Sequence, residues 1–377
     1  MTRASKIFFD AGPDGGPVVF ARPKDLIVAW TPDDVEAALV AVQKALDAGA
    51  WVAGYASYEL GYVFEPKLHS KLPNARNVPF LLFGVFDGPE AVDIPSEGSA
   101  TLTKPVPLWS ADDYKTAFDR VADYIASGDI YQANLTFPMR AKWSGDPWAL
   151  YTMLSERQTV LHGAFVDLGE GPVILSRSPE NFFEVSAERR ISTRPMKGTL
   201  PRGATDAEDR AFKTWLSKDE KNRAENLMIV DLLRNDISRV AETGSVHVPE
   251  LFHVETYATV HQMVSEVAAD LRQDTGFADI LKALFPCGSI TGAPKIRAME
   301  IIHELEAEAR DIYCGSIGWF APDGRARMNV AIRTISLFED GEARLNVGGG
   351  VVYDSTAAAE YEEALWKARY ADLFLQT

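Results

Sequence analysis

The chain alternates between segments in which apolar residues recur at helical spacing and shorter apolar runs that are typical of strands. The clearest helix begins at Ser110, places Tyr114, Phe118 and Val121 on one face, and ends at Gly128. Further helices are expected over about 31–48, 147–156, 206–216, 220–240, 277–285, 295–307 and 356–375. Strands are expected over about 51–57, 79–87, 130–137, 164–167, 173–176, 182–185, 312–319, 328–338 and 344–352, with short strands before residue 30 and an extended segment over 251–271.

The order of these elements indicates an α+β fold. Long strands with helices in pairs differ from the regular strand–helix alternation of a parallel α/β sheet. Residues 88–108 are rich in Pro, Ser, Gly and Glu and form either a linker or one long surface loop. We place a domain boundary there, between an N-terminal region of residues 1–108, packed on the core, and a second domain of residues 109–377.

Composition and charge exclude several classes of protein. Of the 377 residues, 46% are hydrophobic and 24% charged, as in a soluble globular protein. The net charge of −16 argues against nucleic acid and anionic membranes as partners, but it does not exclude a small anionic substrate. The chain shows no membrane span, secretory signal, disulfide framework or zinc-hydrolase pattern. A cytoplasmic protein is expected.

The segment from Arg194 to Arg202 presents a lysine in a preset bend. Lys197 lies between Pro195, which fixes its own φ, and Gly198, which can adopt backbone angles that other residues avoid. The flanking arginines indicate an electropositive neighbourhood. Nearby cations and burial both favour the neutral form of an amine, which is its nucleophilic form. The alternative is a solvated loop lysine.

Acidic residues on two helices form a candidate magnesium site. Glu360 and Glu363 share one face of the last helix with Lys367, and a glycine-rich strand precedes that helix. Paired carboxylates suit Mg²⁺, which takes few protein ligands and keeps water or substrate oxygens. Glu225 lies early on a largely apolar helix, where an acid must be exposed, paired or bound to a metal. Surface or buried salt bridges are the alternative for all three acids.

Three further segments carry candidate chemistry. The turn Gly288–Pro294 precedes a helix and offers backbone N–H groups and a hydroxyl to an anion, although it matches no nucleotide-binding motif. Arg333 is a charge in an otherwise apolar predicted strand and requires a carboxylate, from the protein or from a ligand. Glu180, in a short turn before the Phe182–Phe183 strand, is either a structural acid or a proton donor.

The order of these motifs resembles that of the chorismate-utilising enzymes. The family includes anthranilate synthase component I, aminodeoxychorismate synthase component I, isochorismate synthase and salicylate synthase. The resemblance covers about residues 111–375, and the N-terminal residues match weakly, as in Tyr58–Tyr62. The matching motifs are Gly128–Asn134, Ser178–Glu180, Arg194–Thr199, Glu225–Asp236, Gly288–Pro294, Tyr313–Gly318, Ala331–Thr334 and Gly348–Lys367. The resemblance implies large antiparallel sheets packed face to face with helices outside, and a chorismate-binding catalytic domain at 109–377.

Within this family, Lys197 is similar to a residue of the aminodeoxychorismate synthases. Those members carry P-I-K-G-T where this chain has Pro195–Thr199, and the anthranilate synthases usually have alanine at the lysine. The resemblance therefore implies formation of 4-amino-4-deoxychorismate from chorismate and ammonia, for p-aminobenzoate and folate biosynthesis. Anthranilate synthase is the nearest alternative. Isochorismate and salicylate synthases use water activated by a lysine near the 130–135 strand, where this chain has Gln132. A non-catalytic chorismate-binding subunit would lack Lys197 or the acids.

The resemblance also implies roles for individual residues. Lys197 would attack C2 of chorismate, Glu180 would protonate the departing 4-hydroxyl, and ammonia would enter at C4 and expel the lysine. Glu225, Glu360 and Glu363 would hold Mg²⁺. The residues expected to position the substrate are Thr291, Gly292, Tyr313, Arg333, Gly348, Gly349, Gly350 and Lys367.

Two departures from the family pattern and one missing activity complete the sequence picture. Gln262 stands where anthranilate synthases carry a histidine assigned to pyruvate release, which favours a product that keeps its pyruvyl group. Cys287 replaces a more usual glycine and is expected to be a packed side chain. The chain has no glutaminase site, so ammonia is expected from a separate glutamine amidotransferase subunit. A separate aminodeoxychorismate lyase is expected to follow, because the motifs leave no length for a fused one.

Overall fold

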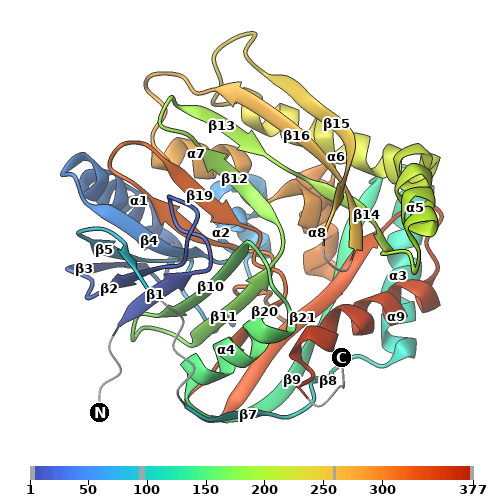
Figure 1. Cartoon of the computed structure of the whole chain (residues 1–377), viewed down its shortest axis with the longest axis horizontal. Coiled ribbons are helices and arrows are strands. Elements are labelled where there is room, and N and C mark those ends of the chain that lie inside the picture. The colour runs from blue at the N-terminus through green and yellow to red at the C-terminus, as the bar shows by residue number, and fades with distance from the viewer. Residues whose placement is uncertain (1–4, 93–97, 258–259, 374–377) are drawn as a thin grey trace.

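The computed structural model describes residues 5–92, 98–257 and 260–373. Their strands form two antiparallel sheets, which we name sheet A and sheet B (Figure 1). Sheet A has the order β17 (Gly292–Ala293), β9 (Gln132–Gly145), β21 (Glu342–Val351), β20 (Thr334–Leu337), β11 (Val173–Ser178), β10 (His162–Asp167), β1 (Lys6–Phe9), β2 (Val18–Ala21) and β6 (Glu90–Ala91), and β7 (Ala100–Leu102) and β8 (Val106–Pro107) pair with β9. Sheet B has the order β14 (Met196–Pro201), β16 (Val260–Asp270), β13 (Arg190–Thr193), β12 (Asn181–Val185), β19 (Ala326–Asn329), β18 (Ser316–Phe320), β4 (Trp51–Ala56), β5 (Leu81–Phe86) and β3 (Asp25–Ala29), and β15 (His247–Thr256) pairs with β16.

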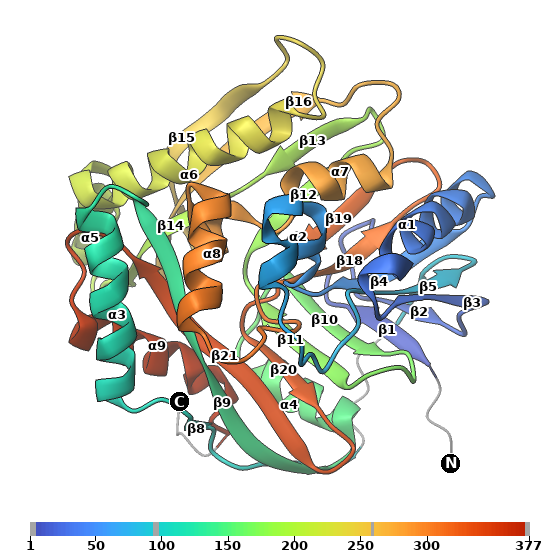
Figure 2. The same cartoon turned by 180° about the vertical axis from the view of Figure 1, so that it is seen from behind.

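Helices lie on the outer sides of both sheets (Figures 1 and 2). They are α1 (Pro32–Asp47), α2 (Leu60–Phe64), α3 (Ala111–Ala126), α4 (Pro147–Arg157), α5 (Asp206–Lys218), α6 (Glu220–Ser238), α7 (Phe277–Leu284), α8 (Lys295–Leu305) and α9 (Ala357–Lys367), with 3-10 turns η1 (Pro66–Lys71), η2 (Gly288–Ile290) and η3 (Ala368–Ala371). No helix among the described residues is long and apolar enough to cross a membrane.

Alternating strand residues explain why the two sheets pack face to face. Along β1, Ile7 and Phe9 point to one buried cluster and Phe8 to another. The first cluster joins both sheets, because it also contains Tyr55 of β4 and Ile317 of β18. Side chains of two sheets therefore interdigitate in this inner core, as in other two-layer β structures. The expected α+β fold with face-to-face antiparallel sheets is confirmed.

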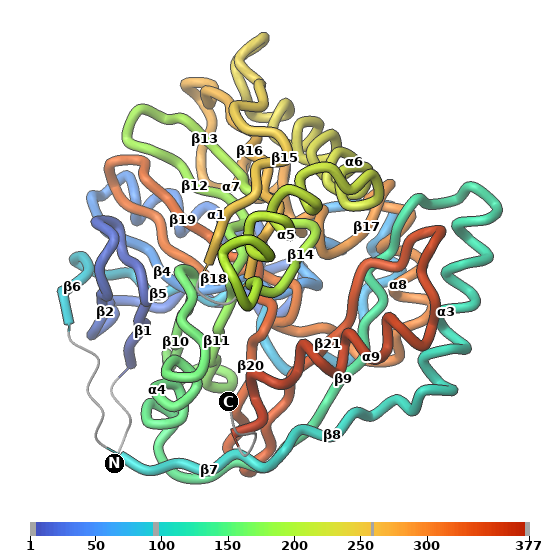
Figure 3. Tube along the Cα trace, turned by 45° about the vertical axis from the view of Figure 1, so that its right-hand side comes forward, coloured from blue at the N-terminus to red at the C-terminus, as the bar shows by residue number. Residues whose placement is uncertain are grey.

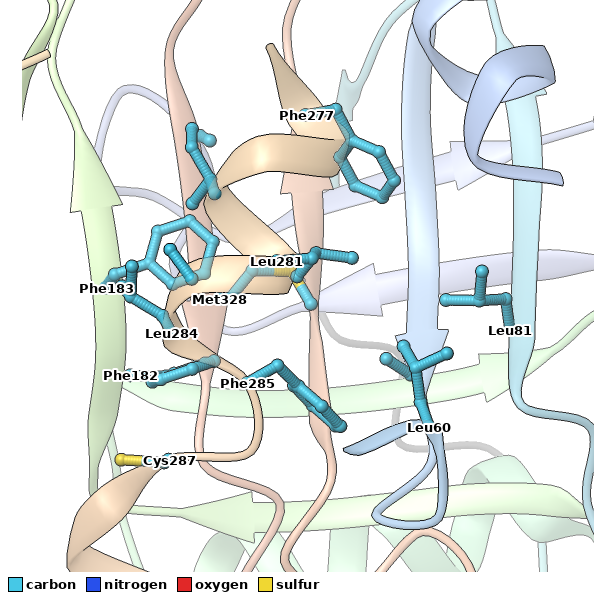
Figure 4. Packing of buried hydrophobic residues seen from close by; sticks show 14 of the residues in the cluster. Leu60, Leu81, Phe182, Phe183, Phe277, Leu281, Leu284, Phe285, Cys287 and Met328 are labelled. Atoms are coloured by element: carbon cyan, nitrogen blue, oxygen red, sulfur yellow. The ribbon is translucent and has the colours of Figure 1, made fainter. Parts of the chain in front are cut away.

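Two outer cores attach the helices. On sheet A, residues of β9 and β21 pack against α3, α4, α8 and α9. On sheet B, an aromatic-rich cluster joins the strands to α1, α6 and α7. Figure 4 shows part of this cluster, with Leu281 of α7 near Met328 and Leu284 of α7 near Phe183. The apolar faces of these helices are thus buried against the sheets.

The boundary expected near residue 108 stays a prediction, and strands from both sides of it complete the same two sheets. β1, β2 and β6 belong to sheet A, and β3, β4 and β5 belong to sheet B. Of the expected linker over 88–108, the described part contains β6, β7 and β8, which pair with β2 and β9. Residues 93–97 of it lie outside the described residues.

Most predicted elements are present, with local corrections. The extended segment over 251–271 is a hairpin of β15 and β16. The strand expected over 312–319 begins only at Ser316, because the preceding residues form a turn. The closing helix ends at Lys367 and continues as the 3-10 turn η3, and the end of the prediction lies outside the described residues. Arg333 is not within a strand, since the chain crosses from β19 in sheet B to β20 in sheet A at that point.

Candidate active site

Lys197 lies on a β-bulge at the edge of sheet B, facing the glycine strand of sheet A. The pairing of β14 with β16 passes from Met196–Val264 to Thr199–Gln262, so two residues of β14 oppose one of β16. Gly198, with φ of +80°, makes this bulge possible. Lys197 Nζ stands 3.3 Å from the position that a Cβ on Gly350 would take. The bulge thus carries the amine across to β21. Figures 1 and 3 show the backbones of β14 and β21 in this part of the molecule.

The predicted electropositive surroundings of Lys197 are wrong. Arg194 forms ion pairs with Glu250 and Glu255 of β15, at 3.4 and 2.6 Å. Arg202 makes two hydrogen bonds to Asp209 of α5, at 2.7 and 2.8 Å. Both flanking arginines are therefore paired with acidic residues of neighbouring elements, and these pairs connect β14 and the residues beside it to β15 and α5. The acidic group that faces Lys197 is Glu180.

Glu180 is a buried acid at the turn between β11 and β12. Ser178 Oγ accepts a hydrogen bond from the backbone N–H of Glu180 at 3.2 Å and so fixes the turn. The Glu180 side chain is 8% exposed, and its Oε1 accepts a hydrogen bond from Ser289 Oγ at 2.8 Å. Burial raises the pKa of Glu180 above its usual value, against the opposing effects of Ser289 and the cations Lys197, Arg333 and Lys367. Glu180 is consequently poised to hold a proton beside Lys197.

The turn that carries Ser289 is buried and joins both sheets to α8. Two carbonyl groups of this connection are satisfied, because Ala293 accepts a hydrogen bond from the N–H of Tyr131 and Thr291 accepts one from the N–H of Asn134. The hydroxyl of Thr291, which we expected to face an anion, donates to the carbonyls of Cys287 and Gly288 at 3.2 Å. Its role in substrate binding stays a prediction.

Gly292 and Cys287 complete this turn. Gly292 has φ of +142°, and a Cβ there would lie 2.2 Å from the carbonyl oxygen of Gln132. Only glycine allows this close approach to β9. Cys287 is 3% exposed and its Sγ lies 3.2 Å from Ser289 Oγ, with burial raising the pKa of its thiol to about 12. It is a packed side chain, as expected, and it touches the residue that binds Glu180.

Gly348, Gly349 and Gly350 form a bare stretch of β21 at the centre of the site. A Cβ on Gly348 would meet the carbonyl oxygen of Leu135 at 2.2 Å, which is a backbone collision within the sheet. Cβ atoms on Gly349 and Gly350 would instead meet the ends of site side chains, at 2.9 Å from Glu360 Oε2 and 3.0 Å from Gln132 Nε2. The first glycine is required by the fold, and the other two keep a cradle open among the functional groups.

The three expected acids approach one another on the outer side of that cradle. Glu360 Oε1 accepts a hydrogen bond from Ser355 Oγ at 2.7 Å. Burial raises the pKa of Glu360, and the nearby carboxylates of Glu363 and Glu225 raise it further, whereas Ser355 and Lys367 oppose the rise. The three carboxylates are therefore near enough to influence one another electrostatically.

Lys367 at present occupies part of this acidic group. Its Nζ forms an ion pair with Glu363 Oε1 at 2.8 Å and donates to the carbonyl of Gly348 at 3.0 Å. Among the described residues, no three His, Cys, Asp or Glu side chains are gathered closely enough to hold a metal ion. The acids have the oxygen donors that Mg²⁺ prefers, and their number suits an ion that keeps water or substrate oxygens as further ligands.

Arg333 and Tyr313 lie where the chain crosses between the sheets. Arg333 has φ of +50°, and none of its interactions within the described residues is a salt bridge. Burial lowers the pKa of Arg333, with Tyr370 and Glu180 opposing the effect. The protein salt bridge that was the alternative for Arg333 is thus absent among the described residues. Tyr313 is buried, at 5% exposure, and burial raises the pKa of its hydroxyl.

The sequence prediction did not include Ser289 and Gln132 among the residues of the site. Ser289 lies inside the Gly288–Pro294 motif, and only the fold shows that it faces Glu180. Gln132 is fully buried, and neither atom of its amide has a hydrogen-bond partner within the described structure. Its position beside Gly350 and Lys197 leaves both amide atoms available to a ligand.

We name Lys197, Glu180, Gln262 and Ser289 the lysine side of the site, and Glu225, Glu360, Glu363 and Lys367 the carboxylate side.

Comparisons with known proteins show which proteins this chain is similar to. The chorismate binding enzyme family matches residues 90–371. Aminodeoxychorismate synthase component 1 of Klebsiella aerogenes is 46% identical over 282 residues, which are 74% of this chain and 61% of that protein. The same component of Escherichia coli K12 is 46% identical over 256 residues, or 68% of this chain and 56% of that protein. The chain therefore matches little more than half the length of these relatives.

More distant comparisons extend the likeness. Anthranilate synthase component 1 of Aquifex aeolicus is 41% identical over 261 residues, which are 69% of this chain and 52% of that protein. The crystal structure of anthranilate synthase component I from Streptococcus pneumoniae superimposes with a TM-score of 0.80 and 24% identity, covering 99% of this chain and 93% of that one. The menaquinone-specific isochorismate synthase of Escherichia coli gives a TM-score of 0.75 and 18% identity, covering 100% and 89%. These two structures share the fold.

Proposed function

The chain belongs to the chorismate binding enzymes, and from that premise we propose that it converts chorismate and ammonia to 4-amino-4-deoxychorismate. The names of the relatives from Klebsiella aerogenes and Escherichia coli support this activity. The observation that carries the proposal is the position of Lys197. Its amine faces the glycine cradle of β21, with a buried carboxyl group beside it.

Lys197 and Glu180 divide the chemistry between them. The neutral amine of Lys197 forms a bond to C2 of chorismate, both conjugated double bonds of the ring shift, and the bond from C4 to its hydroxyl breaks. Glu180 gives its proton to that hydroxyl, which leaves as water. Ammonia then bonds to C4, both double bonds shift back, and the lysine leaves from C2. The covalent step replaces one difficult displacement with two easier ones.

The protonation of Glu180 suits this role. A general acid must carry its proton at the working pH, and an ordinary glutamate does not. Burial raises the pKa of Glu180 and so enlarges its protonated fraction. The Ser289 hydroxyl occupies Oε1, which leaves Oε2 to face the substrate.

The carboxylates of the substrate would bind to Arg333 and Lys367. The first has no carboxylate partner in the described structure, and the second can exchange its carboxylate partner for the ligand. Arg333 is a largely buried guanidinium without a salt bridge in the described structure, and a bidentate carboxylate would satisfy it. Lys367 can exchange Glu363 for a ligand. The glycine backbone of β21, Gly292, Thr291 and Tyr313 would line the remainder of the site.

The carboxylate side would hold Mg²⁺ through Glu225, Glu360 and Glu363. The raised pKa of Glu360, caused partly by the other two acids, reflects a charge that a cation would relieve. When bound, the ion would supply a positive charge for a carboxylate of chorismate. The protein residues around it orient the ring so that C2 faces Lys197.

A partner is implied because ammonia must be supplied. The relatives are named as component 1, which supports a second component. We propose that this component is a glutamine amidotransferase and that a separate lyase converts the product to p-aminobenzoate for folate. Anthranilate synthase is the second candidate, favoured by the Aquifex aeolicus relative. The presence of Lys197 and of Gln262 supports the first.

Product identification tests the proposal. The protein is incubated with chorismate, Mg²⁺ and ammonium at mildly alkaline pH, and the products are resolved by chromatography and mass spectrometry. We expect aminodeoxychorismate, which yields p-aminobenzoate only after a lyase is added. Anthranilate would favour the second candidate, isochorismate or salicylate would identify water as the nucleophile, and an absence of turnover would favour a non-catalytic subunit.

A further inference from the structure

The bulge that presents Lys197 lacks a regular backbone ladder, and a side chain takes its place. Between Met196 and Thr199 the pairing of β14 with β16 is shifted, so the backbone at Lys197 and Gly198 is not held by ladder hydrogen bonds alone. Gln262 of β16 bridges this gap. Its Nε2 donates to the carbonyl of Gly198 at 3.0 Å, and its Oε1 accepts from Thr199 Oγ1 at 2.7 Å.

These two bonds use the donor and the acceptor of one amide. A glutamine amide can donate from nitrogen and accept at oxygen simultaneously, whereas a carboxylate can only accept and a thioether does neither well. Both contacts lie within two residues of Lys197, on the side that follows it in the chain. On the preceding side, Ser265 N–H donates to the carbonyl of Pro195 at 3.2 Å. The lysine is therefore held at both ends by β16.

The outer surface of the bulge provides contact but no comparable hold. A Cβ on Gly198 would lie 2.7 Å from Asn222 Oδ1 and 3.0 Å from Leu216 Cδ1, so α5 and α6 lie directly against the glycine. These contacts limit the space around the bulge without fixing the direction of the next residue. The orientation of Lys197 thus depends on the amide of Gln262.

We propose that Gln262 is a positioning residue that holds the Gly198–Thr199 backbone and thereby aims Lys197 at the substrate. This inference rests on the proposed function for its kinetic consequence only. At this position an amide is useful for its geometry, because it neither gains nor loses a proton near neutral pH. Gln262 accordingly contributes to the formation of the lysine bond and not to a proton transfer.

Chemical labelling of Lys197 tests whether Gln262 positions this lysine, and it does not require the protein to convert a substrate. The full-length protein is treated with a trace of acetic anhydride, and the acetylation rate of each lysine is read by mass spectrometry. In Gln262→Met we expect Lys197 to react about threefold to tenfold faster, because the bulge loosens and the half-buried amine becomes more accessible. Glu266→Gln, a change on the same face of β16, is the matched control and should leave the rate unchanged.

Two further variants separate the hydrogen bonds. Thr199→Val removes only the bond to Oε1 and should raise the labelling rate less than Gln262→Met does, and Thr199→Ser should restore the wild-type rate. Gln262→Glu keeps the acceptor but loses the donor to Gly198, so it should resemble Gln262→Met. An unchanged Lys197 labelling rate in both Gln262 variants overturns the proposal, whether or not the protein converts chorismate.

Steady-state kinetics of the Gln262 variant provide a second test of the proposal. If chorismate is the substrate, Gln262→Met should lower kcat about tenfold and leave KM for chorismate within about twofold, with an unchanged pH profile. A change in the pH profile would instead assign proton transfer to Gln262 and contradict the proposal. Failure of chorismate turnover in the wild type would reject the proposed function alone, because the labelling result does not depend on it.

Discussion

The two sides of the site differ in how completely the protein satisfies their charged groups. On the lysine side, Glu180 is buried and bound by Ser289, and the strand of Lys197 is held by Gln262. On the carboxylate side, Glu363 is 56% exposed and, among the described residues, forms a salt bridge with Lys367 alone, and Glu360 has a raised pKa beside two other acids. The side chains on the lysine side are held in place before a substrate binds. The carboxylate side has more acidic groups than basic ones.

This difference separates chemistry from substrate capture. A residue that forms a covalent bond must be placed accurately before the substrate arrives, because a small misplacement costs much of the rate. Acids that bind a cation and a ligand together gain from remaining adjustable, since the ion and the ligand complete their coordination. Changes on the lysine side should therefore reduce kcat, and changes on the carboxylate side should alter the dependence on Mg²⁺ and chorismate.

The largest effect is expected from removing the nucleophile. Lys197→Ala should lose aminodeoxychorismate formation by roughly 10³-fold or more, because the substitution removes the amine that lies beside Gly350, or it should shift the product towards anthranilate. Product analysis by chromatography measures both. Lys213→Ala, an exposed change on α5, serves as the control. Full aminodeoxychorismate formation by Lys197→Ala would remove the nucleophile from the account.

The next effect concerns the proton donor and its pH dependence. Glu180→Gln should lower kcat by about 10²-fold to 10³-fold. In the wild type, the acid is active while protonated, so its contribution is present below its raised pKa and is lost as pH rises through that value. Ser289→Ala removes an influence that lowers the pKa of Glu180 and should move this alkaline limb to higher pH. A limb that stays in place would show that Glu180 is not the group that titrates.

A pair of glycine substitutions distinguishes site from scaffold. Gly350→Ala would place a methyl group beside Lys197 and Gln132, where only side-chain ends must move, so the protein should fold and lose about 10²-fold in kcat. Gly348→Ala would collide with the backbone of Leu135 and should lower the melting temperature measurably. Thermal unfolding and kinetics of both variants make the comparison, and the reverse pattern would contradict the assignment.

The smallest effect is expected on the carboxylate side. Glu363→Gln and Glu360→Gln should raise the Mg²⁺ concentration for half-maximal activity by about tenfold, with kcat at saturating Mg²⁺ reduced less. Glu362→Gln, an exposed neighbour on α9, should change neither value and is the matched control. Activity measured across a Mg²⁺ titration decides the matter. Equal Mg²⁺ dependence in all three variants would exclude these acids as ligands.

Sequence reasoning reached the fold and the principal side chains, because those depend on local pattern and on motif order. Apolar periodicity located most of the helices and strands, although it missed α2, β13 and β14, and the glycine-rich strand before α9 indicated the cradle. It failed where long-range pairing decides the outcome. Arg194, on one side of Lys197, is paired with Glu255, which is 61 positions away and is brought near only by the fold. Arg202, on the other side, is paired with Asp209 on the following helix, a contact that apolar spacing does not indicate.

The same limit explains why the sequence did not predict the hydrogen bonds that position Glu180 and the backbone beside Lys197. Ser289 is 109 positions from Glu180, and Gln262 is 64 positions from Gly198. Neither contact follows from spacing along the chain. Gln262 was noted only as a departure from a family histidine, and its contact with the bulge became visible once β14 and β16 were paired.

The most direct test of the account is to look for the covalent bond to Lys197. The protein is mixed with chorismate and Mg²⁺ without ammonia, stopped in acid within one turnover, digested, and examined by mass spectrometry. The account predicts that the peptide containing Lys197 gains the mass of chorismate less one water, and that added ammonium removes this adduct. Full product formation with no adduct on Lys197 at any time would contradict covalent catalysis by this residue.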